Sequence, residues 1–362
     1  MCTSIAGRHR QGAYTVAMTR LPDPEELLDD AVVVRLPMRT RFRGQIVREA
    51  MLLRGPAGWA EFAPFPEYAA AESAAWLDAA VEAGWRGLGT PRRTHVPINA
   101  TMPAVMAGEV PAVLERYGRP ETIPAVKIKV AEPGQSLAED LARIREVARL
   151  VPHAGLRVDA NGGWSHAEAL HAIETIAAVV GERLEYAEQP VAGVEPLAVL
   201  REELHRRGVP VRLAADEAVR KAEDPLRVAR LGAADLIVVK VPPLGGVGRA
   251  AEVVRASGLD AVVSSALDTS IGLAAGLALA ARLDSLPFAC GLGTAALLAA
   301  DIVDHPLIPR EGALPVPLRD GVVVAPEPAE RLLAEHRVEG ERRAWWEERL
   351  RAAHAVLEEA AS

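Results

Sequence analysis

The fold is decided by five short apolar runs: AVKIKV at 125–130, LRVDAN at 156–161, LEYAEQ at 184–189, VRLAADE at 211–217 and LIVVKV at 236–241. Each run is followed by a turn and then by a stretch of helical composition. Strands that alternate with helical segments in this way indicate parallel β–α units. The five runs therefore predict a parallel sheet whose strands are connected by helices.

Three more runs extend the pattern to eight units: VPINA at 96–100, AVVSS at 261–265 and FACGLG at 288–293. Between the runs, Ser165 and Glu168 form a capping-box pattern, and helices are expected at 136–150, 165–180, 196–207 and 247–256. Eight units over about 200 residues predict a closed barrel of the α/β class. An open doubly wound sheet is the alternative, but no G-x-G-x-x-G motif follows the first run.

The segments on either side of the barrel have a different pattern. Residues 30–54 alternate like an antiparallel hairpin with Gly55 and Gly58 near its turn, and a helix is expected at 67–84. Beyond the barrel we expect one more strand at 321–325 and a charged helix at 342–361. These flanks predict a small α+β capping domain built from both termini.

The expected domain limits follow from these patterns. Residues 1–17 have no clear periodicity, so they are expected to be a disordered extension or to precede a true start at Met18. The other expected units are the first part of the capping domain at 18–94, the barrel at 95–317 and a segment that returns to the capping domain at 318–362.

Composition excludes several classes of function. The 362 residues carry a net charge of −8 with both signs interspersed, so a nucleic-acid partner is not expected. No window reaches the run of about 18 apolar residues that a membrane helix needs. The two cysteines, Cys2 and Cys290, imply no disulfide framework and suit a reducing compartment. We therefore expect a cytoplasmic protein, monomer or homo-oligomer, that acts on a small molecule.

Charged side chains stand near the ends of five successive runs: Lys129, Asp159, Glu188, Asp216 and Lys240. They are separated by 24 to 30 residues, which is one β–α unit each time. In a β/α barrel the carboxyl ends of the strands meet at one mouth, where active sites form. One acid at a strand end is usually a cap or half of a salt bridge, but three in successive units favour a shared ligand. We therefore expect the five side chains to converge.

Three carboxylates that converge from neighbouring strands repel one another unless a cation lies between them. An all-oxygen set without cysteine or histidine favours Mg²⁺, with Mn²⁺ as an alternative, over zinc. Two lysines beside such a cation suit removal of a proton from the carbon next to a carboxylate, since the cation takes the charge that develops on the oxygens. Asp159, Glu188 and Asp216 are thus predicted metal ligands, and Lys129 and Lys240 the predicted catalytic groups.

Neighbouring residues are candidates for contacting the substrate or for supporting the ligands. Side chains two apart in a strand share a face, so Lys127 should point inward with Lys129, and Arg157 and Asn161 should point inward with Asp159. Serines at strand ends often only cap helices, and glycines there often only make turns. Ser264, Ser265, Gly291 and Gly293 are the remaining candidates for contacts with the substrate, and a cap or a turn is the alternative explanation for each.

The chain resembles the muconate-lactonizing branch of the enolase superfamily in the order of five motifs: KIK at 127–129, DAN at 159–161, EQP at 188–190, DE at 216–217 and Lys240. The likeness extends from about Leu27 to Pro317. It implies a modified TIM barrel of the (β/α)7β type with a capping domain. Enolase-superfamily sites are a known case of a lysine or histidine base that works with Mg²⁺.

Within that branch the chain is most similar to the o-succinylbenzoate synthases, in RVDANG at 157–162, SSALDTSIG at 264–272 and CGLGT at 290–294. Such enzymes dehydrate 2-succinyl-6-hydroxy-2,4-cyclohexadiene-1-carboxylate to 2-succinylbenzoate in menaquinone biosynthesis. The resemblance implies a hydro-lyase in which Lys129 is the base and Lys240 stabilises the enolate.

Related activities are alternatives. Dipeptide epimerases carry Asp-x-Asp where this chain has Gly291-Leu292-Gly293, and N-acylamino acid racemases place an arginine soon after the second lysine, where this chain has Val241-Pro242-Pro243. Muconate cycloisomerases usually have an acidic residue late in the barrel, and none stands near Cys290. The racemase and the cycloisomerase stay open. A catalytically inactive barrel that binds metal or ligand is the non-enzyme alternative, but both lysines are present.

Three arginines alternate along the predicted hairpin, at positions 39, 41 and 43. In an extended strand they face the same way. They are either a solvated hairpin face or the source of one guanidinium that binds the succinyl carboxylate of the implied substrate.

Overall fold

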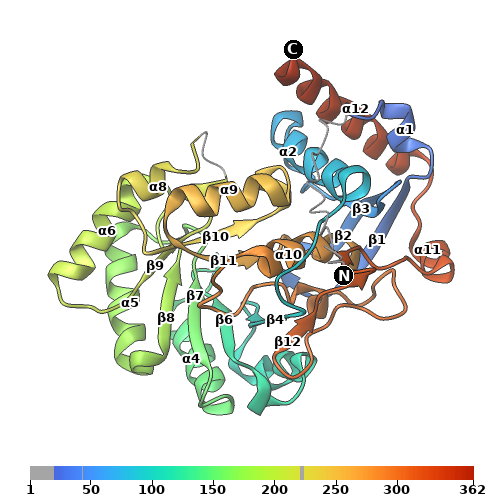
Figure 1. The fold of residues 1–362 in the computed structure, drawn as a ribbon. Helices are drawn as coiled ribbons and strands as arrows, with labels where there is room; N and C mark the ends of the chain where they lie inside the picture. The colour runs from blue at the N-terminus through green and yellow to red at the C-terminus, as the bar shows by residue number, and fades with distance from the viewer. Residues whose placement is uncertain (1–19, 43, 221–223) are drawn as a thin grey trace, which may run out of the picture.

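The computed structural model describes residues 20–42, 44–220 and 224–362 (Figure 1). The predicted extension at 1–17 and Arg43 of the hairpin therefore lie outside the described residues. The described chain forms a β/α barrel and, beside it, a smaller unit of antiparallel strands and helices (Figure 1). The predicted fold class, a modified TIM barrel with a capping domain, is confirmed.

In the described part of the chain, seven parallel strands make up the barrel sheet, in the spatial order β11-β10-β9-β8-β7-β6-β5. Each strand lies beside the next one along the chain, as short β–α connections favour. Their bounds are β5 Ala100–Met102, β6 Ala125–Lys129, β7 Gly155–Asp159, β8 Leu184–Glu188, β9 Leu213–Ala215, β10 Leu236–Lys240 and β11 Asp260–Ser264. Most of these residues are buried, because helices cover the outside and side chains fill the interior.

The barrel is closed by the segment around Cys290, which forms two isolated parallel bridges instead of the regular strand predicted at 288–293. Cys290 bridges Ile98, and Gly291 bridges Ser264. Glycine weakens a strand because it has no side chain to pack, and this segment has two glycines. The eighth unit therefore closes the barrel without becoming a full strand.

The run predicted at 96–100 is divided between two sheets. β4 (His95–Pro97) pairs with β12 (Ala313–Pro315), and only β5, from Ala100, joins the barrel. Pro97 has no amide hydrogen, but its carbonyl accepts from the Cys290 amide at 2.7 Å. The division thus places the first strand next to the closing segment.

Helices connect the strands where the sequence predicts them. The cap predicted at Ser165 is confirmed: its hydroxyl accepts from the Glu168 amide at 3.4 Å, and its own amide donates to the Glu168 carboxylate at 2.8 Å. The helices of the barrel are α3 Val110–Leu114, α4 Leu137–Leu150, α5 His166–Val180, α6 Val194–Arg206, α7 Glu217–Arg220, α8 Arg227–Arg230, α9 Val247–Ser257 and α10 Ser270–Arg282. None of the helices in the described ranges is long and apolar enough to cross a membrane.

The smaller unit is a three-stranded antiparallel sheet with helices from both ends of the chain. Its strands are β1 Val32–Phe42, β2 Gln45–Gly55 and β3 Gly58–Phe62, and its helices are α1 Pro24–Leu28, α2 Ala70–Val81, α11 Glu330–His336 and α12 Glu341–Ala361. The antiparallel hairpin predicted at 30–54 is confirmed by the pairing of β1 with β2, but the placement of its turn near Gly55 is wrong, because that turn connects β2 to β3. The β1–β2 turn instead contains Gly44, whose φ of 75° suits glycine.

The C-terminal residues return to this sheet. Of the strand predicted at 321–325 only β14 (Val322–Val323) forms, paired with β13 (Leu318–Arg319). Trp346 of α12 is fully buried and meets Phe62 edge to face, with ring centroids 6.0 Å apart. These contacts support the proposal that residues 318–362 complete the capping domain.

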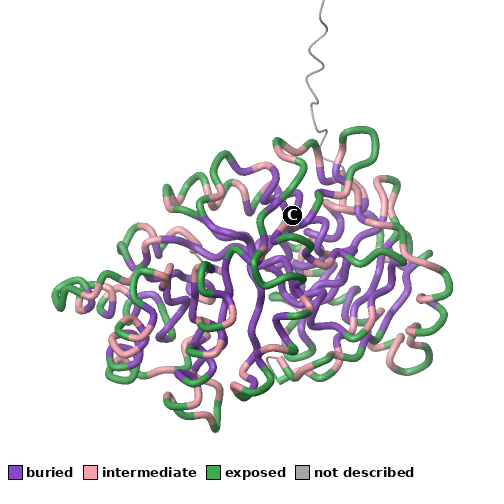
Figure 2. The backbone as a smooth tube through the Cα atoms, turned by 90° about the horizontal axis from the view of Figure 1, so that it is seen from below, coloured by how far each residue is buried: buried purple, intermediate pink, exposed green. Residues whose placement is uncertain are grey.

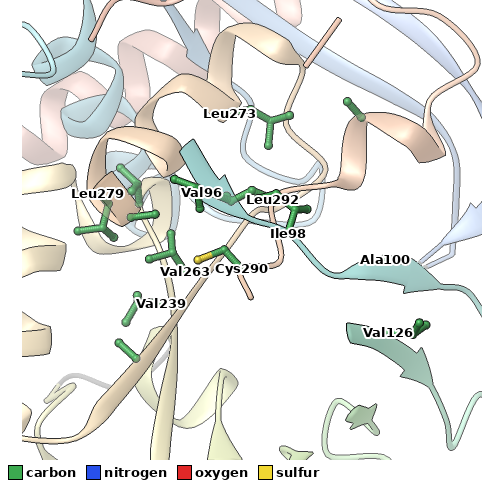
Figure 3. Close-up of a cluster of buried hydrophobic side chains, with 14 of the residues drawn as sticks. Val96, Ile98, Ala100, Val126, Val239, Val263, Leu273, Leu279, Cys290 and Leu292 are labelled. Atoms are coloured by element: carbon green, nitrogen blue, oxygen red, sulfur yellow. The ribbon is translucent and has the colours of Figure 1, made fainter. Parts of the chain in front are cut away.

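Buried residues run through both units (Figure 2). The largest cluster fills the barrel and takes in one face of β1 and β2, and a second cluster covers the other face of these strands together with α2 and α12. The barrel core includes the closing segment, where Cys290 and Leu292 lie against Ile98 (Figure 3). Cys290 is a free, buried cysteine. Apolar packing thus holds the closure together where strand hydrogen bonds are few.

Candidate active site

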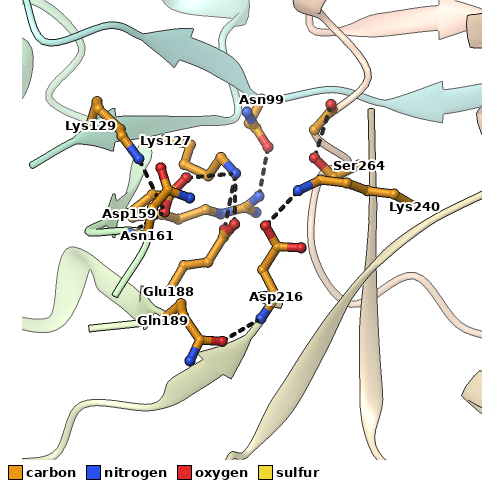
Figure 4. A network of polar contacts seen from close by, with 12 residues as sticks. Asn99, Lys127, Lys129, Asp159, Asn161, Glu188, Gln189, Asp216, Lys240 and Ser264 are labelled. Carbon is orange, nitrogen blue, oxygen red and sulfur yellow. Dashed lines mark hydrogen bonds and ion pairs between the residues drawn. The ribbon is translucent and has the colours of Figure 1, made fainter. Parts of the chain in front are cut away.

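The structure brings the five predicted charged residues to one end of the barrel (Figure 4). Lys129, Asp159, Glu188 and Lys240 are the last residues of β6, β7, β8 and β10, and Asp216 follows β9 directly. All five are buried. They converge because parallel strands end at the same edge of the sheet.

Lys127 lies between two of the carboxylates. Its Nζ is 2.9 and 3.0 Å from the Glu188 carboxylate oxygens and 3.3 Å from Asp159 Oδ2. Burial alone would lower the pKa of Lys127, but the charges of Glu188 and Asp159 outweigh it and raise that pKa. Lys127 therefore stays charged and supports the two carboxylates.

Asp216 is held by two cations. Lys240 Nζ lies 2.5 Å from its Oδ2, and Arg220 Nε lies 3.1 Å from its Oδ1. Burial would raise the pKa of Asp216, but Lys240 and Arg220 lower it well below its usual range. Arg220 was missed in the sequence, although its place four residues after Asp216 puts it within reach once α7 forms.

Lys129 is the least constrained of the lysines. Its Nζ is 3.7 Å from Asp159 Oδ1 and, among the described residues, makes no hydrogen bond. Lys129 and Lys240 lie on opposite sides of the carboxylates (Figure 4). Burial lowers the pKa of Lys240. The site thus has one lysine Nζ on either side of the carboxylates.

The donor set suits a hard divalent cation in its chemistry, because it is buried and offers only carboxylate oxygens. Burial and then the charge of Asp159 raise the pKa of Glu188 to about 7, which shows the repulsion that a cation would relieve. In the described ranges no three His, Cys, Asp or Glu side chains stand ready to hold a metal ion. The ammonium groups of Lys127 and Lys240 neutralise the carboxylates instead.

The two residues expected to share a face with Asp159 have different positions. Asn161 follows the strand with a φ of 45°, so strand alternation no longer applies there; its side chain donates to Glu217 at 3.3 Å. Arg157 stays inside the barrel, where it donates to the Asn99 side chain at 2.9 Å and to Glu185 at 2.6 Å. Only Asn161 reaches the cavity of the site.

A narrow cavity of about 30 Å³ is lined by Lys127, Asp159 and Lys240 of the charged cluster, whereas Lys129, Glu188 and Asp216 do not line it. Ser264, Ser265 and Gly291 line it, and the Ser265 hydroxyl donates to the Gly291 carbonyl at 2.9 Å. Gly293 does not line it: a Cβ there would meet the Tyr117 ring at 3.0 Å, so this glycine serves packing. The lining residues that the sequence reading missed are Phe42, Thr101, Ala266, Leu267 and Thr294.

Comparisons with known proteins agree with this geometry. The family model described as Enolase C-terminal domain-like matches residues 106–330, and the Enolase N-terminal domain-like model matches residues 33–84. A curated o-succinylbenzoate synthase from Mycolicibacterium smegmatis is 48% identical over 343 residues, which are 93% of this chain and 99% of the relative. The o-succinylbenzoate synthase of Mycobacterium tuberculosis is also 48% identical, over 93% of this chain and 97% of its own.

The chain belongs to the o-succinylbenzoate synthase family of the enolase superfamily.

Solved structures of other enzymes share the fold of this o-succinylbenzoate synthase family member. The muconate lactonizing enzyme of Pseudomonas fluorescens, complexed with muconolactone, has a TM-score of 0.69 at 20% identity and covers 85% of this chain and 98% of its own. The L-Ala-D/L-Glu epimerase of Bacillus subtilis has a TM-score of 0.68 at 21% identity, over 82% and 98%. Because identity is low, these likenesses concern the fold alone.

In this family member the two hairpin arginines that the structure describes, Arg39 and Arg41, do not line the cavity. Arg39 is exposed and donates to the Leu298 carbonyl at 3.0 Å, and Arg41 is exposed too. Phe42, on the other face of β1, lines the cavity instead. The solvated-face interpretation thus describes positions 39 and 41 better than a contact with the substrate.

Proposed function

We propose that the chain catalyses the o-succinylbenzoate synthase reaction, the dehydration of 2-succinyl-6-hydroxy-2,4-cyclohexadiene-1-carboxylate to 2-succinylbenzoate. The observation that carries the proposal is the pair of buried lysines on opposite sides of three carboxylates at the barrel mouth (Figure 4). The curated relatives with that name cover 93% of the chain.

In the proposed reaction Lys129 Nζ removes the proton from the ring carbon that carries the carboxylate. Electron density moves onto the carboxylate oxygens and then returns to the ring as the C–O bond to the neighbouring hydroxyl breaks. Lys129 delivers its proton to that hydroxyl, which leaves as water, so the ring becomes aromatic and the base is restored. Lys129 suits this role because no described hydrogen bond occupies its Nζ, which must be the neutral amine to take the proton.

Lys240 is proposed to stabilise the enolate from the side opposite Lys129. Its positive charge would face the carboxylate oxygens of the substrate. Asp159, Glu188 and Asp216 are proposed to hold Mg²⁺ or Mn²⁺, which supplies positive charge for the same oxygens when bound. Lys127 and Arg220 hold the orientation of the three carboxylates through the ion pairs described above. Ser264, Ser265, Asn161 and Gly291 are proposed substrate contacts, because they line the cavity.

The test is turnover by the purified protein with Mg²⁺ on three substrates in parallel. We expect the cyclohexadiene substrate to be converted to the aromatic product, and N-succinyl amino acids and muconate to react at least about tenfold more slowly in kcat/KM, a difference of roughly 1.4 kcal/mol. Preferred turnover of muconate or of an N-succinyl amino acid would instead assign the alternative activity.

The biological setting is part of the proposal. The reaction belongs to menaquinone biosynthesis, and we place it in the cytoplasm, where a small carboxylate substrate is the only partner required. Loss of menaquinone in a deletion strain, with rescue by 2-succinylbenzoate, is the expected phenotype.

A further inference from the structure

The segment Ala266–Thr269 connects the end of β11 to the start of α10 and forms one wall of the cavity. Ala266 and Leu267 line it directly, next to Ser264 and Ser265. Leu267 has a φ of 63°, a left-handed conformation that a residue with a branched side chain rarely adopts. Such a conformation persists only where surrounding contacts hold it. Two of the contacts that hold this wall come from the capping domain.

The first contact is made by Arg48 of β2. Arg48 is 2% exposed, and its Nε donates to the carbonyl of Leu267 at 3.1 Å. The same guanidinium donates to the Ala63 carbonyl and lies over the Phe65 ring, 4.6 Å from the centroid. Arg48 therefore joins the left-handed residue of the wall to the capping domain.

The second contact is made by Glu61 of β3. Its carboxylate accepts from the Thr269 amide at 3.0 Å and from the Thr269 hydroxyl, and that hydroxyl caps α10 by accepting from the Ile271 amide at 3.2 Å. Gly272 allows this approach, since a Cβ there would stand 2.9 Å from Glu61. Glu61 thus holds the other end of the same segment.

We infer that Arg48 and Glu61 are positioning residues through which the capping domain shapes the substrate cavity. They fix the backbone of the Ala266–Thr269 wall, and the position of that wall determines how well the succinyl group of the substrate fits. Neither side chain lines the cavity. Their effect passes through the backbone that they bind. The inference rests on the proposed function for its substrate, but the fixation of the wall stands on the contacts alone.

The electrostatics of the contact support a role for hydrogen bonding rather than for charge. Burial, and then the nearby charge of Asp268, raise the pKa of Glu61 to about 8. Near neutral pH its carboxyl is therefore largely protonated, and glutamine has a matching carbonyl acceptor. Glu61→Gln should keep the contact with Thr269, whereas Glu61→Ala should lose it.

The experiment combines kinetics with amide hydrogen exchange on the full-length protein. Arg48→Met, Arg48→Lys, Glu61→Ala and Glu61→Gln are compared with Glu49→Gln. Glu49 is the matched control because it follows Arg48 in β2 but binds Arg342 and Trp346 of α12 on the opposite face. The measured quantities are KM, kcat, Mg²⁺ affinity and the exchange rates of peptides from 264–272.

We expect Arg48→Met and Glu61→Ala to raise KM at least about tenfold, with kcat and Mg²⁺ affinity changed less than about threefold. Exchange across 264–272 should accelerate in both. Arg48→Lys should be intermediate, because lysine keeps the charge but lacks the planar fork, and Glu61→Gln and Glu49→Gln should match wild type.

Two results would overturn the inference: unchanged exchange at 264–272 in Arg48→Met and Glu61→Ala, or faster exchange with KM within about threefold of wild type. If Arg48→Met fails to fold, Glu61→Ala against Glu61→Gln decides alone. Failure of wild type to convert the cyclohexadiene substrate would reject the proposed function instead, and the exchange comparison would still test whether these residues fix the wall.

Discussion

At the scale of single residues, Lys129 carries the proposed chemistry, so its replacement gives the sharpest test. Lys129→Ala removes the base without removing a described hydrogen bond, and we expect turnover to fall by about 10²–10⁴-fold. Folding and Mg²⁺ affinity should stay close to wild type. Steady-state kinetics and calorimetric metal titration provide the measurements. Activity within about tenfold of wild type, or 1.4 kcal/mol, would contradict the assignment of Lys129 as base.

The charged residues at strand ends could be predicted because, in a β/α barrel, residues spaced one β–α unit apart at the carboxyl ends of strands meet at the same mouth. Asn161 could not be placed by the same rule, since it lies two residues beyond the end of β7, in a left-handed conformation. Phe42 and Arg48 were out of reach for another reason. Their contacts with the barrel join segments more than 200 residues apart, and no local pattern records such a pairing.

At the scale of elements, α12 is predicted to stabilise the capping domain through one face. Trp346 is fully buried, packs on Phe62 and donates to Glu49 at 3.0 Å. Trp346→Ala should lower the free energy of unfolding by about 3–5 kcal/mol, measured by urea denaturation. The matched change Trp345→Ala, at the half-buried neighbour, should cost clearly less. Equal losses from the two changes would show that α12 does not depend on this buried face.

Elements with local determinants were predicted well. The helix at 165–180 has its own capping residues, so its start needs no tertiary contact. The closing segment at 288–293 has no such determinant, because its two glycines favour no regular structure and its bridges depend on strands that precede it by many residues. The hairpin at 30–54 could be predicted from its alternation, but the place of its turn could not, because glycines stand both between β1 and β2 and between β2 and β3.

At the scale of the whole molecule, metal dependence tests whether the barrel mouth works as one site. Excess chelator should abolish turnover, and Mg²⁺ or Mn²⁺ should restore it. The enolate needs a cation to take its negative charge, and the three carboxylates at the barrel mouth are the proposed ligands of that cation. The control is magnesium-saturated chelator, which should leave activity unchanged. Full turnover in excess chelator would rule out the proposed mechanism.

Stability against pH tests the interface between the capping domain and the barrel. The pKa of Glu61 is raised from 4.5 to about 8, by burial first and then by Asp268, while Arg48 opposes the shift. The folded state therefore keeps a proton that the unfolded chain releases above its own pKa.

The stabilisation is complete below the unfolded pKa of about 4.5 and is lost as pH rises through about 8. We expect Tm of the metal-free protein to fall between about pH 5 and pH 8 by differential scanning calorimetry. Glu188, with a pKa of about 7, acts in the same direction in every variant that retains it. Glu61→Gln removes the titration of Glu61 and its repulsion with Asp268, so its profile should be shallower than that of wild type. Parallel profiles would show that Glu61 is ionised in the folded protein.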